Sequence, residues 1–385
     1  MKNVLNLEEF IAESTSIFLM DNETKKRLLI LDERYHKLIE KFRTKYVAQT
    51  VDNIREEFDK FMSAKKNGQK YYPQLEIQNS SVDMKLYDDF GKLIDDFEEI
   101  KDKCYIVKFY LEKIHSMRSS LEQRKKLEDG TYEPGPNPVD KELYKEALEI
   151  IKDNPYKKPD FKKERNKDAD EVKERIEDAL DDLGYNFDVE IDSGMLPRMN
   201  VKMGHVNINK TSRFSDADID GLIAHELKGH VGRRYYGKQT GLWLFAYGLQ
   251  SSSIFDEGLA VWNSIHKVKH KKDNVMFNIA MKTCVSYLMF EMDFCDLFDW
   301  VKRHAKDMTD YTAFKTVVRP RRRNKDCRIM SGESMVTYLT GKNLVDKMDN
   351  KMRNDILHYN IGPDQLFELD NIKEFLKVNH FKPLK

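Results

Sequence analysis

The sequence is short of cysteine and has no excess charge of either sign. Its four cysteines form no C-x-x-C pair, which argues against a disulfide framework and a thiolate zinc site and indicates a reducing compartment such as the cytosol. Lysine plus arginine and aspartate plus glutamate number 66 each, so no global charge favours a nucleic acid or a membrane as partner. We therefore expect a cytoplasmic protein that binds neither.

Long apolar runs and a secretory leader are also missing. No stretch approaches the ~18 apolar residues that are needed to span a bilayer. The chain begins MKNVLNLEEF, which is acidic and interrupted by polar residues instead of basic and then apolar. With 40% apolar and 34% charged residues, the composition is that of a soluble globular protein with a sizeable core.

The first part of the chain has a helical pattern. From about Lys25 to Leu127, apolar residues recur three and four positions apart, which predicts a helix bundle. A Gly- and Pro-rich segment closes the bundle, a shorter helix is expected around Glu142 to Ile151, and a second break follows. We therefore predict a helical N-terminal region over residues 1–158 and a catalytic region over residues 159–385.

The pattern changes in the second region. A helix is expected from roughly Asp168 to Leu183, and Gly184 ends it. The short segments NFDVEID, RMNVKM and HVNIN then alternate apolar and polar residues, which predicts the strands of a small antiparallel sheet. The predicted fold class is α+β and mainly helical, with one small sheet beside the next helix.

That helix carries a candidate metal motif. Ser215 with Asp218 three residues later is a capping-box signature, and the helix that it opens contains A-H-E-L-K-G-H, with His225, Glu226 and His230. Histidines four apart differ by ~40° around an α-helix, whereas histidines five apart differ by ~140°. An undistorted helix could not aim both rings at one ion.

We therefore predict a π-bulge or a break within H-E-x-x-x-H, which Gly229 and Gly232 would tolerate. A carboxylate from a following helix is the usual third ligand of such a site, and Glu257 in D-E-G-L-A-V-W is the candidate. Glu226 would then act as the base that takes a proton from the water activated by the metal. The alternative is that these histidines serve only as hydrogen-bonding residues.

From Asp168 to Gly341, these motifs resemble the H-E-x-x-x-H metallopeptidases with a Gln-Glu-Gly-Leu-Ala motif, which include the microtubule-associated tyrosine carboxypeptidases. The resemblance implies a zinc-peptidase-like region with one zinc ion and Glu226 as the catalytic residue. The implied metal ligands are His225, His230 and Glu257. Arg233 matches the arginine that follows the second histidine in the family.

Further on, Arg319 and Arg322 match the arginines of a family R-x-x-R-G element, and Tyr338 matches the tyrosine of Tyr-Leu-x-Gly. The chain departs from the family at three places. Asp256 replaces the usual Gln, Arg323 stands where Gly is expected, and Glu333-Ser334-Met335 stands where a Lys-Asp pair is usual. These departures bear on substrate choice more than on metal binding, and the N-terminal region shows no matching motif.

The predicted activity is that of a zinc metallopeptidase, in particular a carboxypeptidase that trims the C-terminal tail of a protein or peptide, such as an aromatic residue after acidic ones. Arginine binds a terminal carboxylate through a planar fork, so the candidate substrate-binding residues are Arg233, Arg319 and Arg322, with Tyr338 added by the resemblance. Arg233, Tyr235 or Tyr236 could stabilise the oxyanion. We read His266 and His270 as surface residues.

Two rival functions stay open. The chain could be a binding protein that keeps the fold without turnover, although such a protein would have no need of Glu226. It could also hydrolyse non-peptide amides or esters, because the same metal and base serve any acyl transfer. For Arg319 to Lys325 the alternative is a solvated basic loop or a polyanion patch.

Overall fold

The computed structural model describes residues 18–46, 51–77, 81–157, 166–192, 198–202, 204–266, 272–321, 324–328 and 335–384. Within these ranges the protein is mainly helical with one three-stranded sheet, which confirms the predicted α+β class. No described helix is long and apolar enough to cross a membrane.

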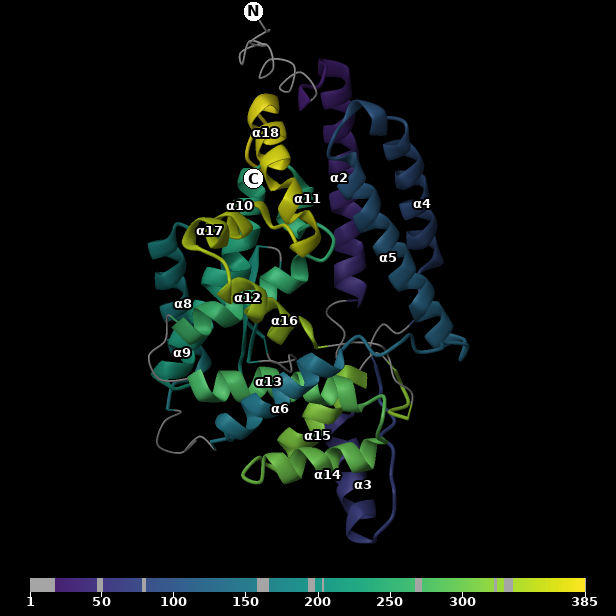
Figure 1. The fold of residues 1–385 in the computed structure, drawn as a ribbon, viewed down its shortest axis with the longest axis vertical. Helices are drawn as coiled ribbons and strands as arrows, with labels where there is room; N and C mark the ends of the chain where they lie inside the picture. The colour runs from purple at the N-terminus through teal and green to yellow at the C-terminus, as the bar shows by residue number, and fades with distance from the viewer. Residues whose placement is uncertain are drawn as a thin grey trace, which may run out of the picture.

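Three N-terminal helices lie side by side along one flank of the molecule (Figure 1). They are α2 (Asn22–Tyr46), α4 (Met84–Glu98) and α5 (Val107–Glu128). The apolar residues of α2 that recur three and four positions apart are buried. They are Leu28, Leu31, Tyr35, Leu38, Ile39 and Phe42. The same core includes residues of C-terminal helices α17 (Asn350–Tyr359) and α18 (Leu369–Asn379). Residues far apart in sequence therefore share one core.

A second core lies at the other end of the molecule (Figure 1). The helix α3 (Ile54–Lys66) does not join its sequence neighbours α2 and α4; Phe58 and Phe61 pack here instead. Their partners come from α14 (Phe294–His304) and α15 (Asp310–Val318). Also in this core are α6 (Lys141–Asp153), where the shorter helix was expected, and α13 (Lys272–Leu288). The predicted boundary near residue 158 stays a prediction.

The sheet is mixed, so the expectation of a purely antiparallel sheet was wrong. Its strands are β1 (Asp188–Asp192), β2 (Met199–Lys202) and β3 (His205–Asn209), in the order β1-β3-β2. The chain reverses after β1 and again after β2, and β3 takes the central position. Hence β3 is antiparallel to β2 but parallel to β1. Alternation within each strand cannot reveal which strands are neighbours.

The apolar face of this sheet packs against α8 (Ala169–Leu183), the helix expected there. Asp168 and Glu171 form its capping box, and Gly184 ends it in the left-handed conformation with φ of 68°. The sheet and α8 together support the helices that follow. In chain order these are α9 (Asp216–Leu222), η2 (Ile223–Val231), α10 (Gly232–Gln239), α11 (Trp243–Tyr247) and α12 (Ser252–His266).

Two glycines set how closely α12 crosses α16 (Thr337–Asp346). A Cβ atom on Gly258 would overlap the backbone of Gly341, and one on Gly341 would overlap the carbonyl oxygen of Ile254. Because these contacts are with backbone, no rotamer change could relieve them. The glycines of E-G-L-A and Y-L-T-G are therefore required by the same helix crossing.

We predict that Gly258→Ala or Gly341→Ala lowers the free energy of unfolding by about 1–3 kcal/mol through overpacking. The matched control is Gly221→Ala, because Gly221 lies in α9 and its Cβ would meet no atom within 4 Å. Since alanine is the better helix former, the control should be neutral or stabilising by up to about 1 kcal/mol. Urea unfolding measures all three, and equal stability of all three variants would contradict the prediction.

A buried carboxylate joins the N-terminal helices to α11. Asp32 on α2 is 2% exposed and accepts hydrogen bonds from the Tyr110 hydroxyl (2.6 Å) and from the backbone N–H groups of Trp243 (2.9 Å) and Leu244 (3.3 Å). Burial raises the pKa of Asp32 to about 7, although these hydrogen bonds oppose the shift. Asp32 therefore holds its proton to a higher pH in the folded protein than in the unfolded chain.

Since this folded pKa lies above the unfolded value, the contribution of Asp32 to stability is fully present below pH ~4 and is lost as the pH rises through about 7. We therefore compare the wild type with Asp32→Asn. The difference between their free energies of unfolding should fall by roughly 3 kcal/mol between pH 5 and pH 8, because only the wild type loses this contribution. Urea unfolding of both proteins at the two pH values measures this difference. A pH-independent difference would show that Asp32 titrates normally.

Candidate metal centre

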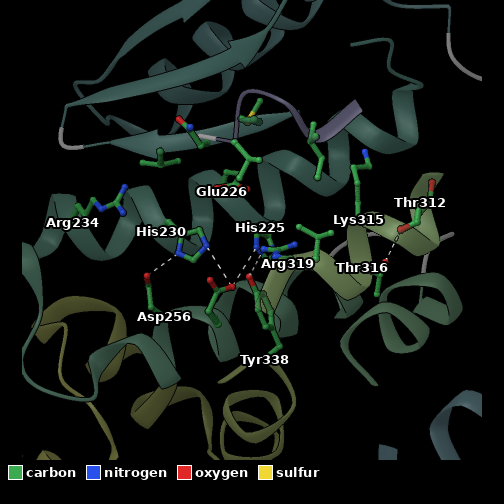
Figure 2. Close-up of a pocket in the computed structure, with 17 residues that line it drawn as sticks. His225, Glu226, His230, Arg234, Asp256, Thr312, Lys315, Thr316, Arg319 and Tyr338 are labelled. Carbon is green, nitrogen blue, oxygen red and sulfur yellow. Dashed lines mark hydrogen bonds and ion pairs between the residues drawn. The ribbon is translucent and has the colours of Figure 1, made fainter. Parts of the chain in front are cut away.

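The H-E-x-x-x-H segment forms a π-helix. In η2 the backbone widens over Ile223–Val231, between the α-helical turns of α9 and α10, which confirms the predicted distortion. The wider turn aims His225 and His230, five residues apart, toward one point (Figure 2). Gly229 has a further role that the sequence did not indicate. A Cβ atom added at Gly229 would lie 2.8 Å from the Cβ of Ala260, so glycine at this position lets α12 pack closely against η2.

The two histidines meet Glu257 from α12. His225 Nε2 and His230 Nε2 each lie 3.9 Å from Glu257 Oε2, and one ligand atom from each residue lies within 4.8 Å of the others. Ligand atoms of a tetrahedral zinc site stand about 3.4 Å apart, so a small contraction would close the group on an ion. Oε2 of Glu257 is buried and accepts no hydrogen bond in the described part of the protein. A cation would satisfy it, and the residues therefore fit a metal.

The ring of His225 is held in the form that a metal requires. Its Nδ1 lies 3.2 Å from the Ser264 hydroxyl, which donates its own proton to the carbonyl oxygen of Ala260. Nδ1–H of His225 therefore donates to Ser264, and the lone pair on Nε2 faces Glu257. Burial, the charge of His230 and that of Lys282 lower the pKa of His225 to about 3, so this imidazole is neutral.

The environment of His230 is different. Its Nδ1 lies 2.9 Å from Asp256 Oδ2. Burial alone would lower the pKa of His230, but the charge of Asp256 and its contact with the ring raise it to about 9. Burial would likewise raise the pKa of Asp256, yet His230 and Arg233 hold it below its usual range. The two histidines thus have one neutral and one anionic partner.

Glu226 is half-buried beside the ligands and lines the same cavity. Burial raises the pKa of its carboxyl group to about 7, against the opposing charge of His230. A carboxylate whose pKa lies near neutrality can both accept and return a proton. Glu226 therefore has the position and the pKa that suit a general acid–base residue.

The three candidate ligands face a cavity of about 630 Å³. Figure 2 shows that Thr312, Thr316 and Lys315 line one end, while Arg234 lies beyond His230 at the other. The edge strand β2 contributes Met199, Asn200 and Val201. A smaller cavity of about 300 Å³ shares Thr312, Thr316 and Arg319 with the first. Its remaining lining residues are Asn278, Met281, Lys282, Met308 and Met335.

Two of the predicted substrate-binding residues reach this cavity. Arg319 and Tyr338 both line it, and the Arg319 guanidinium donates to the Tyr338 hydroxyl at 3.2 Å. Nζ of Lys282 lies 3.5 Å above the Tyr338 ring. Arg322, like Arg323, lies outside the described residues.

Arg233 is not among the residues that line the cavity, contrary to our expectation for a substrate-binding residue. Its side chain is 0% exposed and is held by Asn360 and Ile361. The next residue, Arg234, lines the cavity instead. Arg234 is four residues after His230, one helical turn along the same face, and this spacing could have identified it from the sequence.

The remaining aromatic and histidine candidates lie elsewhere. Tyr235 and Tyr236 pack against Tyr185 and are not among the residues that line the cavity, so neither is placed to stabilise an oxyanion there. His266 is exposed and stacks on Trp262, as expected of a surface residue, and His270 lies outside the described residues.

A π-helical H-E-x-x-x-H segment, a glutamate on α12 and a carboxylate beside these candidate ligands form a site of the kind found in metallopeptidases. The family model of the microtubule-associated tyrosine carboxypeptidases matches residues 130–322, half of the chain. The protein belongs to this family of metallopeptidases. A comparison with curated proteins found no match.

We predict that Glu257→Ala loses stoichiometric metal, because two imidazoles alone provide too few ligands. Elemental mass spectrometry of the purified protein measures the metal content. Glu190→Ala removes a carboxylate from the exposed face of β1 and should leave that content unchanged. Equal metal content in the two variants would remove Glu257 from the ligand set.

Proposed function

We propose that the protein is a zinc-dependent carboxypeptidase that removes the C-terminal residue of a protein or peptide. The observation that carries the proposal is the convergence of His225, His230 and Glu257 beside Glu226 in one cavity. Two imidazoles and one carboxylate, with a position left for water, are a ligand set that zinc hydrolases use. A bound zinc ion supplies Lewis-acid polarisation of the scissile carbonyl and acidifies the attacking water.

The side chains divide the remaining work. Glu226 accepts a proton from the attacking water as the water oxygen bonds to the carbonyl carbon. It then delivers that proton to the leaving amine as the C–N bond breaks. Tyr338 donates a hydrogen bond to the developing oxyanion. Burial, together with the charge of Glu257, raises the pKa of Tyr338 above its ordinary value, so the hydroxyl keeps its proton at neutral pH.

The edge strand favours a peptide over other amides and esters. Among the described strands β2 has one neighbour, β3, and three of its residues line the cavity. Its free edge offers backbone N–H and C=O groups along the cleft, and an extended peptide can pair with them as an additional strand. A small ester or amide would leave these groups unused.

The smaller cavity favours removal of a terminal residue. Three methionines, Met281, Met308 and Met335, give it an adaptable apolar lining, and about 300 Å³ accommodates an aromatic side chain. Arg319 stands at the junction of the two cavities and can bind the terminal carboxylate through its fork. Arg322 remains a sequence-based candidate for the same role. A C-terminal tyrosine agrees with the name of the family.

The charges along the larger cavity favour acidic residues before the terminal one. Arg234 and Lys315 line it, and Nη1 of Arg234 is buried without a hydrogen-bond partner among the described residues. A carboxylate side chain of the substrate would provide that partner. We therefore propose an acidic tail that ends in tyrosine as the substrate, and the cytoplasm as the compartment.

The test uses two peptides with the same acidic sequence ending in tyrosine, one with a free C-terminus and one amidated. We expect wild type to release tyrosine from the free peptide only, and Glu226→Gln to be at least ~10²-fold slower while keeping its zinc. Mass spectrometry of the products and of the metal content measures both. Cleavage of both peptides would indicate an endopeptidase, and zinc without cleavage would favour a binding protein.

A further inference from the structure

The two histidines differ in what holds their second ring nitrogen. His225 Nδ1 meets the neutral hydroxyl of Ser264 at 3.2 Å, whereas His230 Nδ1 meets the carboxylate of Asp256 at 2.9 Å. Asp256 directly precedes Glu257 on α12, so the same helical turn supplies a candidate metal ligand and the partner of another. Figure 2 shows Asp256 on the side of the His230 ring that faces away from His225.

Asp256 is itself held by a buried cation. Nε of Arg233 lies 3.8 Å from Asp256 Oδ1. The same guanidinium donates to Asn360 Oδ1 at 3.0 Å and to the carbonyl oxygen of Ile361 at 2.7 Å. Asn360 ends α17 in the left-handed conformation, with φ of 46°, and donates to the carbonyl oxygen of Ala246. Arg233 is thereby fixed by the chain that follows α17 and by α11.

These contacts form a continuous path from buried Asn360 and Arg233 to the half-buried Asp256 and His230. Two basic side chains flank the Asp256 carboxylate, with His230 Nδ1 at 2.9 Å and Arg233 Nε at 3.8 Å. A carboxylate that accepts Nδ1–H fixes the tautomer and orientation of a ligating imidazole and makes Nε2 more basic. A neutral hydroxyl does this more weakly.

We propose that Asp256 is a positioning residue for the metal: its carboxylate pairs with His230 Nδ1, 2.9 Å away, and so aims Nε2 at the ion, while Arg233 holds Asp256 in place. Asp256 also lines the cavity, but the role proposed here acts through His230 and involves no proton transfer to or from substrate. The inference rests on the metal site of the proposed function, but it needs no assumption about the substrate.

The test measures zinc affinity on the purified full chain by competition with a chromophoric chelator. We expect Asp256→Ala to bind zinc about 10–100-fold more weakly than wild type. The matched variant Ser264→Ala removes the neutral partner of His225 and should cause a smaller loss. Zinc affinity of Asp256→Ala equal to that of wild type, or a loss no greater than that of Ser264→Ala, would overturn the proposal.

Asp256→Asn provides a second test in case the alanine variant does not fold. It keeps the shape and an acceptor oxygen but loses the charge, so its zinc affinity should lie between those of wild type and Asp256→Ala. In the cobalt-substituted proteins, the visible absorption bands should shift in Asp256→Asn, because they report ligand geometry. Unchanged zinc affinity and an unchanged spectrum in a folded Asp256→Asn would contradict the role of the charge.

Arg233→Met tests the outer part of the path. It should weaken zinc binding in the wild-type background and have little further effect in Asp256→Ala, because neighbours that act through one another are not additive. Additive losses would show that Arg233 does not act through Asp256. Zinc bound as expected but without peptide cleavage would refute the proposed function and leave this inference standing.

Discussion

The site depends on one backbone constraint, the π-helical turn of η2. An α-helix would point residues 225 and 230 in different directions, and only a wider turn gives them one focus. A π-turn is less stable than an α-turn, so the surrounding structure must hold it. Capped α9 fixes one end, while α12 packs against the turn itself, where Gly229 meets Ala260.

Close packing of helices places Glu257, the third candidate ligand. Gly229 lets η2 pack closely against α12, and Gly258 and Gly341 let α12 pack closely against α16. Each glycine removes a Cβ where two backbones meet, so the three helices are tightly spaced. Glu257 and Tyr338 lie beside these contacts, from α12 and α16. The same close packing therefore places a metal-ligand candidate and the hydroxyl that we propose for the oxyanion.

Buried ionisable side chains connect this centre to distant parts of the chain. Asp32 ties α2 to the start of α11, and Arg233 ties α10 to the segment after α17. A buried polar group is costly unless it is hydrogen-bonded, so each of these side chains fixes the geometry of the elements around it. The N-terminal and C-terminal helices share a core with α11 and α12, so they pack against the helix that carries Glu257.

The sequence by itself determined the local features: the helix start near Asp168, the capped start at Ser215, the amphipathic face of α2, and the need for a bulge or break between His225 and His230. These follow from hydrogen bonds and periodicities within a few residues. It also gave Glu257 as a ligand candidate, through the E-G-L-A motif. The family resemblance pointed to the same residues, and the family match supports the class of enzyme.

Tertiary structure alone decided which of two adjacent arginines reaches the cavity. The hydrogen bonds of Arg233 to Asn360 and Ile361 hold its side chain away from the cavity, whereas Arg234 lines it. It also decided that β1 runs parallel to β3, that α3 leaves its neighbours for a second core, and that three methionines from separate segments line a side cavity. Each of these depends on contacts between residues far apart in the chain, and no local pattern of side chains encodes such contacts.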